Sequence, residues 1–129
     1  MATRTATSTA VPQSGGQLVS WTGMQATSND EGSAFYIPDA GTITVGAVIG
    51  TGGTGALNMQ GSFTGGTAST EWHTMVNPAG GALAALTISA TGASALIQVG
   101  SRPLYIRPVL SGSGNAADIT VYMHIRPRS

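Results

Sequence analysis

The amino-acid sequence predicts an all-β fold: an antiparallel two-sheet sandwich, jelly-roll-like, with an extended N-terminal arm. From residue 18 onward, short stretches rich in β-branched and aromatic residues alternate with Gly, Asn, Asp, Ser and Pro. Only residues 80–86 have a helical pattern, and the glycines that begin this stretch favour a turn or a short strand. A length of 129 residues suits one domain with one hydrophobic core.

Residues 1–17 are expected to form the extended arm, and residues 18–129 a single sandwich domain. The first 17 residues are mostly Thr, Ser, Ala and Gly and have no periodic apolar face. Such a segment cannot bury enough surface to order itself. The arm is therefore expected to dock on a neighbouring subunit.

Nine strands are expected in the sandwich domain, at residues 18–24, 34–37, 42–48, 56–63, 71–76, 83–90, 95–99, 104–110 and 118–126. The last strand has the clearest pattern, because every second residue from Ile119 to Ile125 is apolar. Side chains alternate between the two faces of a strand, so this apolar set is predicted to pack into the core.

Turn chemistry and prolines predict how some strands are connected. The glycine-rich stretch 50–55 and the segment 112–115 are expected to form hairpin turns, since Gly and Asn reach positive φ easily. Pro103 and Pro108 lack the backbone N–H that a central strand needs on both sides. Strand 104–110 is therefore expected at a sheet edge or next to a bulge.

The composition is unusual in its low charge. Charged residues make up 8% of the chain, which has five Arg, no Lys and five acidic residues, against about 25% in typical domains. Such a surface is better suited to being covered by neighbours than to keeping monomers apart. The net charge of zero argues against nucleic-acid binding, which needs a basic face.

The chain has no cysteine, which excludes disulfides, zinc–thiolate sites and thiol nucleophiles. The N-terminal sequence lacks the apolar segment of a secretory signal, and no stretch approaches the roughly 18 apolar residues of a membrane helix. We therefore expect synthesis in the cytoplasm and no membrane contact.

Three segments, in order, resemble a group of small tailed-phage virion proteins. They are Leu57-Asn-Met-Gln-Gly-Ser62, then Trp72-His-Thr-Met75 after a Gly-rich turn, then Leu104-Tyr-Ile-Arg-Pro-Val-Leu-Ser-Gly112. The resemblance covers roughly residues 42–126. Relatives often carry an Asn-Asp-Gly turn where this chain has Phe63-Thr-Gly-Gly-Thr67.

This resemblance implies a capsid decoration, or cement, protein. Such proteins bind over the seams of the major capsid protein as homodimers or homotrimers and stiffen the shell. It implies a virion location on the outer capsid surface, after synthesis in the host cytoplasm. It also implies contact surfaces in place of catalytic residues.

The residues that could form a catalytic or metal site have simpler explanations. Glu71, His73 and His124 contain the right ligands for a metal or acid–base cluster, but outward-facing strand positions, with Trp72 turned into the core, explain them better. Residues 29–31 offer oxygen ligands for calcium, although a solvated turn fits better. No Gly-x-Ser-x-Gly elbow or phosphate-binding loop occurs. We therefore expect no enzyme activity, no cofactor and no metal.

The arginines are the interface candidates, because guanidinium groups pair with carboxylates of a partner. These candidates are Arg4, Arg102, Arg107, Arg126 and Arg128. Arg107 stands out, since it lies inside an apolar strand and must either face solvent or have a partner.

The alternative function is a glycan-binding sandwich module of a head fibre or tail component. Aromatic rings that stack on sugars are the basis of this hypothesis. The candidate rings are those of Trp21, Tyr36, Trp72 and Tyr105.

Overall fold

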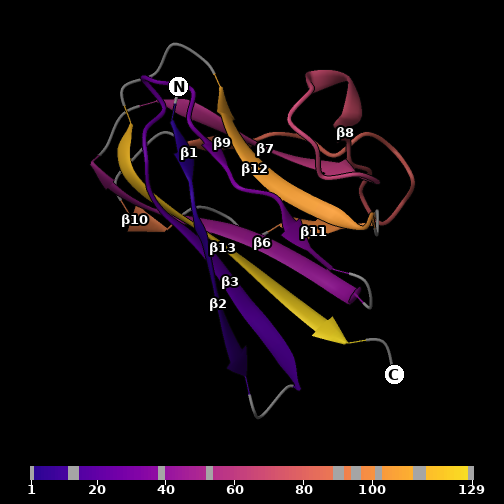
Figure 1. Ribbon diagram of the computed structural model, residues 1–129. Helices are drawn as coiled ribbons and strands as arrows, with labels where there is room; N and C mark the ends of the chain where they lie inside the picture. Colours follow the sequence, from indigo (N-terminus) through magenta and orange to yellow (C-terminus); the bar gives the residue numbers. More distant parts are fainter. Residues whose placement is uncertain are drawn as a thin grey trace.

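The computed structural model describes residues 2–11, 15–37, 40–51, 54–88, 92–93, 97–100, 103–111 and 116–127. Within these residues the chain forms two packed β-sheets, so the predicted β-sandwich is confirmed (Figure 1). A short 3-10 turn, η1 (Ser69–Glu71), interrupts the strands. No helix in the described part of the chain is long and apolar enough to cross a membrane.

The first sheet, called sheet A here, contains seven strands among the described residues, and its main path runs β1-β4-β12-β7-β8. Its strands are β1 (Thr3–Arg4), β4 (Glu31–Gly32), β5 (Phe35–Tyr36), β7 (Gly55–Ser62), β8 (His73–Thr74), β9 (Leu86–Ile88) and β12 (Tyr105–Ser111). β5 pairs with β12, and β9 pairs with β7. The β1–β4 pair is parallel, and the other pairs of this sheet are antiparallel.

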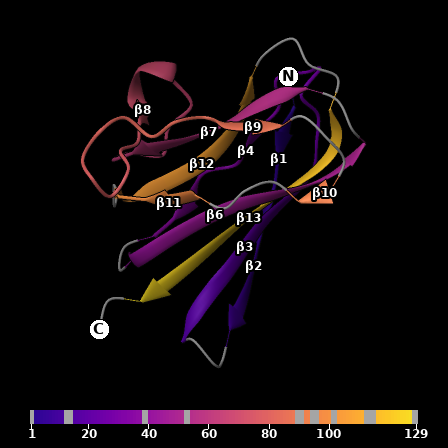
Figure 2. The same cartoon turned by 180° about the vertical axis from the view of Figure 1, so that it is seen from behind.

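In the part of the chain that the structure describes, the second sheet, sheet B, contains six strands, and its main path runs β10-β6-β13-β3-β2. Its strands are β2 (Ala6–Val11), β3 (Gly16–Met24), β6 (Ala40–Thr51), β10 (Gly92–Ala93), β11 (Ile97–Val99) and β13 (Ala117–Pro127). β11 pairs with β6 beside β10. Figure 2 shows β6, β13, β3 and β2 side by side in one twisted layer.

The core lies between the inner faces of the two sheets. In β13 the predicted alternation is confirmed: Ile119, Val121 and Met123 are fully buried and Ile125 nearly so. Leu57, Ile106 and Leu110 supply the opposite face from β7 and β12. The single core is therefore built from strands that are far apart in the sequence.

The N-terminal segment is extended, as predicted, but it is not a free arm. β2 pairs with β3 along its whole length, from Ala6 opposite Trp21 to Val11 opposite Gly16. β1 pairs with β4 in the other sheet. Backbone hydrogen bonds to β3 order this segment. A Thr-rich strand can be held in a sheet by such bonds without an apolar face of its own.

Two predicted hairpins are wrong. β6 lies in sheet B and β7 in sheet A, so the stretch 50–55 connects the sheets. The same applies to β12 and β13, and residues 112–115 between them lie outside the described part of the chain. Turn-forming residues allow the chain to reverse, but the choice of sheet depends on which faces must be buried.

The predicted edge position of residues 104–110 is also wrong, because β12 pairs with β7 on one side and with β4 and β5 on the other. Leu110 donates its N–H to the Asp30 carbonyl on the β4 side. Pro108, two residues earlier, therefore directs its nitrogen to the same side, where the ladder is interrupted between β5 and β4. A central strand can hold proline at such a gap.

Candidate functional site

The outer face of sheet A carries a charged cluster centred on Arg107. Arg107 alternates with the buried Ile106 and Pro108 along β12, so its side chain points away from the core. Its Nε donates to Gln60 Oε1 at 3.0 Å, and its Nη1 lies 3.1 Å from Glu31 Oε2. Its guanidinium carbon lies 4.2 Å from the centre of the Trp72 ring. The partner that the sequence demanded for Arg107 therefore comes from its own chain.

Burial and charge act in opposite directions on this cluster. The side chain of Arg107 is 12% exposed and that of Glu31 is 19% exposed. Burial lowers the pKa of the Arg107 guanidinium, and the nearby Glu31 carboxylate partly offsets this effect. The guanidinium stays charged, because even a lowered arginine pKa lies far above neutrality.

Trp72 is buried, at 7% exposure, but it does not belong to the core between the sheets as predicted. Its ring covers Arg107 on the outer face of sheet A, and its Nε1 donates to the Gly66 carbonyl at 2.8 Å. On the outer face the Trp72 ring can stack on the planar guanidinium of Arg107, a contact that the apolar core does not provide. Trp72 therefore anchors the loop 63–72 to the sheet.

Hydrogen bonds close this loop on itself. Ser62 Oγ accepts the backbone N–H groups of Thr64 and Gly65 at 3.1 and 3.0 Å. Glu71 accepts the Thr64 hydroxyl at 2.7 Å and the Ala68 N–H at 3.2 Å. Glu71 is thus a loop-forming residue.

Two pairs of aromatic side chains lie at this end of sheet A, on opposite faces, because Tyr105 is opposite Ser62 and His73 is opposite Gly61. Tyr36 and Tyr105, which are opposite each other on β5 and β12, have ring centres 5.1 Å apart. Phe63 and His73 have ring centres 6.4 Å apart. Tyr36 is 54% exposed and Phe63 is 73% exposed. Phe63 and His73, called the aromatic cluster here, and Tyr36 on the other face present ring surfaces that an outside molecule can contact.

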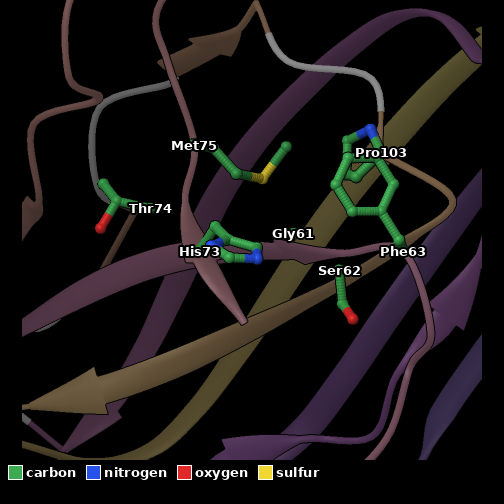
Figure 3. A pocket seen from close by; sticks show the side chains of 7 residues that line it. All are labelled: Gly61, Ser62, Phe63, His73, Thr74, Met75 and Pro103. Atoms are coloured by element: carbon green, nitrogen blue, oxygen red, sulfur yellow. The ribbon is translucent and has the colours of Figure 1, made fainter. Parts of the chain in front are cut away.

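A pocket of about 240 Å³ adjoins the aromatic cluster. Figure 3 shows Phe63 and Pro103 on one side of it and His73 on the other. The complete lining is Gly61, Ser62, Phe63, His73, Thr74, Met75 and Pro103. The wall is mainly apolar, with Ser62, His73 and Thr74 as its polar residues, which suits a ring-shaped or apolar ligand group.

The candidate metal ligands do not come together. His73 lies in sheet A, whereas His124 lies in β13 of sheet B, alternating with the core residues Met123 and Ile125. No group of three or more His, Cys, Asp or Glu side chains able to hold a metal ion occurs among the described residues. The side-chain oxygens of Asp30 and Glu31 are engaged by cationic, N–H or hydroxyl groups of the chain itself.

The predicted interface arginines have different environments. Arg4 forms an ion pair with Asp30 at 3.0 Å, and its side chain is 35% exposed. Arg126 is exposed near the end of β13. Arg102 and Arg128 lie outside the described residues. The structure therefore leaves Arg126 as the candidate with a guanidinium open to a partner.

Two of the rings predicted to stack on sugars are not buried, and one exposed ring was not predicted. Trp21 is fully buried, and its Nε1 donates to the Ser33 carbonyl at 3.0 Å, so it has no face for a sugar. Tyr36 and Tyr105 remain as the predicted candidates. Phe63 was missed, although its position beside a glycine-rich turn is a typical signal for an exposed loop residue.

Two solved structures are similar to this chain. A cleaved adhesin domain of Lys-gingipain from Porphyromonas gingivalis matches with a TM-score of 0.50 and 12% identity, covering 98% of this chain and 85% of that one. The N-terminal cellulose-binding domain of a Cellulomonas fimi β-1,4-glucanase matches with a TM-score of 0.33 and 10% identity, covering 96% and 76%. No family model and no curated protein matches the chain. At such identity the adhesin-domain likeness supports the β-sandwich fold alone.

Proposed function

We propose that this chain is a capsid decoration subunit of a tailed phage, which binds the major capsid protein as a homo-oligomer and stabilises the shell. The observation that carries the proposal is the arrangement of the three motif segments that resemble phage virion proteins. They supply β7, β8 and β12, which are neighbours in sheet A. Trp72 of the second segment stacks on Arg107 of the third. The motifs are thus parts of one structural unit.

The charge distribution also supports this proposal. Of the three arginines that the structure describes, Arg4 and Arg107 are held in ion pairs within the chain. A surface with so few free charges has little electrostatic protection against association. Covering this low-charge surface with the capsid shell would prevent such association.

Co-sedimentation with capsid shells tests the proposal. Purified chain is mixed with source-phage shells that lack it, and the shells are pelleted. Saturable binding at a copy number comparable to that of the major capsid protein is expected. Absence of the chain from the pellet at all concentrations would reject decoration.

Arg126→Glu gives a second readout of the same assay. Reversing an exposed charge at the end of β13 is expected to weaken shell binding if Arg126 meets a carboxylate of the shell. Thr70→Glu is the control: it introduces the same negative side chain at an exposed position of η1, between β7 and β8 of sheet A, although it changes the charge by one unit and not two. Equal weakening by both substitutions would point to a general charge effect.

The aromatic cluster favours a second candidate function, glycan binding in a head fibre or tail component. Exposed rings beside a mainly apolar pocket are typical of sugar-binding surfaces. The likeness to the adhesin domain of Lys-gingipain is compatible with this candidate, although the likeness concerns the fold. Saturable binding on a glycan array that Phe63→Ser abolishes would favour it over decoration.

A further inference from the structure

The outer edge of sheet B is formed by β2. Among the described residues β3 is its one strand partner, and residues 7–10 are exposed. Figures 1 and 2 both show β2 at the margin of the molecule, where it runs with β3 beyond the ends of the other strands. Proteins usually protect such an edge with charged residues, proline or a bulge. Residues 6–10 contain no charge and no proline, and their register with β3 is regular.

The backbone of β2 offers hydrogen-bonding groups along this edge. Successive residues of an antiparallel strand direct their N–H and C=O groups to opposite sides. The Ala6 N–H donates to Ser33 Oγ at 3.0 Å and not to β3. By alternation, Ser8 and Ala10 also direct their backbone groups away from β3. The Ala6 N–H is already bonded to Ser33, so the backbone groups of Ser8 and Ala10 form the part of this edge that is open to another strand.

The sequence of this edge is its own complement. Ala6-Thr-Ser-Thr-Ala10 reads the same in both directions around Ser8. If two copies pair antiparallel about a two-fold axis at Ser8, Thr7 lies opposite the partner's Thr9, and Ala6 lies opposite the partner's Ala10. Thr–Thr pairs are favourable across strands, and small residues opposite each other avoid clashes. An isologous contact of this kind is self-complementary by symmetry.

We propose that β2 is the contact through which two copies of this chain form a two-fold dimer, with Ser8 on the axis. The two copies of sheet B then form one continuous sheet. Ser8 donates its N–H to the carbonyl of the partner's Ser8, and the partner donates in return. Thr7 and Thr9 extend the outer face beside Ser20 and Leu18 of β3. This inference names the contact behind the homo-oligomer of the proposed function and rests on it in that respect, but the contact itself does not require a capsid.

Mass measurement across concentration tests the dimer. The full chain is studied by sedimentation velocity from about 1 μM to about 500 μM. A two-strand junction is a small interface, so a dissociation constant in the micromolar range is expected. The expected result is a shift toward twice the chain mass of 12.9 kDa. A monomer over the whole range overturns the proposal.

Two matched lysine variants locate the contact. Ser8→Lys places two like charges opposite each other on the axis and is expected to raise the dissociation constant at least tenfold. Thr87→Lys adds the same charge at an exposed position of β9, a strand of sheet A, and is expected to leave the dimer unchanged. A dimer that resists Ser8→Lys, or that only Thr87→Lys disrupts, uses another surface.

Single cysteines test the register even if a lysine variant fails to fold. The chain has no native cysteine, so each introduced thiol is the only one. Cα atoms of directly opposed residues lie about 4.5–5.5 Å apart in antiparallel sheets, within reach of a disulfide. Under mild oxidation, Ser8→Cys is expected to give a covalent dimer, and Thr7→Cys much less of it. Equal or reversed yields would overturn the proposed axis.

The tests of the β2 dimer and the shell-binding test can fail independently of each other. A chain that is monomeric in solution but saturates capsid shells loses the β2 dimer and keeps decoration. A Ser8-linked dimer that ignores shells keeps this inference and loses decoration.

Discussion

The buried carboxylate of Asp30 lies 3.0 Å from the guanidinium of Arg4. It also accepts the backbone N–H groups of Ala2 at 2.9 Å and Gln25 at 3.0 Å. Asp30 is fully buried, so these donors replace the water that the charge has lost. One carboxylate thereby joins the N-terminal strand β1 to the turn that precedes β4.

Asp30→Asn is expected to destabilise the fold. The amide keeps the size of the side chain but loses the charge that Arg4 and the two backbone donors bind. A loss of about 2 kcal/mol in the free energy of unfolding is expected, since hydrogen bonds to charged groups contribute roughly 1.5–3 kcal/mol. Urea titration measures it. Arg4→Gln is the control, and its effect should be smaller because the two backbone donors remain. A larger effect of Arg4→Gln would contradict this explanation.

Asp30 also predicts a pH dependence of stability. Burial alone would raise the pKa of this carboxyl group, but the hydrogen bonds from Ala2, Arg4 and Gln25 and the charge of Arg4 outweigh burial and lower the pKa below its ordinary value of 3.8. The unfolded state then binds more protons, so this contribution is present above about pH 4 and is lost as the pH falls through the folded pKa.

Thermal unfolding between pH 7 and pH 2.5 checks this sign. The melting temperature of the native chain should fall at the acidic end more steeply than that of Asp30→Asn, which has no carboxyl group to protonate there. Parallel curves for the two proteins would show that Asp30 does not carry the dependence.

Arg107→Met is expected to lower the free energy of unfolding by about 1–3 kcal/mol. The substitution removes the contact with the Trp72 ring and the hydrogen bond to Gln60, and it leaves Glu31 without its ion-pair partner. As the loop 63–72 loosens, Trp72 should become more exposed, and tryptophan emission should shift to longer wavelength. Trp21 stays buried in the core, so it should not contribute to the shift.

Two further variants give this measurement its controls. Arg107→Lys keeps the charge but lacks the planar fork, so it should recover less than half of the loss. Arg126→Met removes an exposed arginine and should change stability by less than about 0.5 kcal/mol. Full recovery by lysine would mean that charge alone, without stacking, explains the role of Arg107.

Gly65→Ala is expected to disturb the packing of the loop 63–72 on Tyr105. Gly65 has φ +68°, and an added Cβ would lie 2.8 Å from the Tyr105 ring. The left-handed backbone costs alanine about 1–2 kcal/mol, and the ring contact adds to this. Gly80→Ala separates the two effects, because Gly80 has φ +92° with no atom within 4 Å of the added Cβ. Urea titrations should show a larger loss at position 65, and equal losses would rule out the contact.

The sequence predicted the sandwich because local patterns determine strands well. In β13 the alternation of apolar residues is visible without a structure, and each apolar residue from Ile119 to Ile125 lies in the core. Because burying a charge is costly, the sequence predicted that Arg107 either faces solvent or has a partner. In the structure its partners are Glu31, Gln60 and Trp72.

Long-range pairing could not be predicted in the same way. β2 has no continuous apolar face, and it is held mainly by its ladder with β3, which the sequence does not encode locally. The central position of β12 depends on the gap between β4 and β5 beside Pro108, which no local signal in the sequence encodes. Trp72 is buried against a cation on the outer face, where hydrophobicity alone would have placed it in the core.

The most direct test of the decoration proposal is the copy number of this chain on purified particles. Particles from the source lysate are isolated on a density gradient, and peptide mass spectrometry quantifies the chain against the major capsid protein. The proposal predicts a number of copies comparable to that of the shell protein. A few copies per particle, as in a fibre or tail part, or no copies at all, would contradict it.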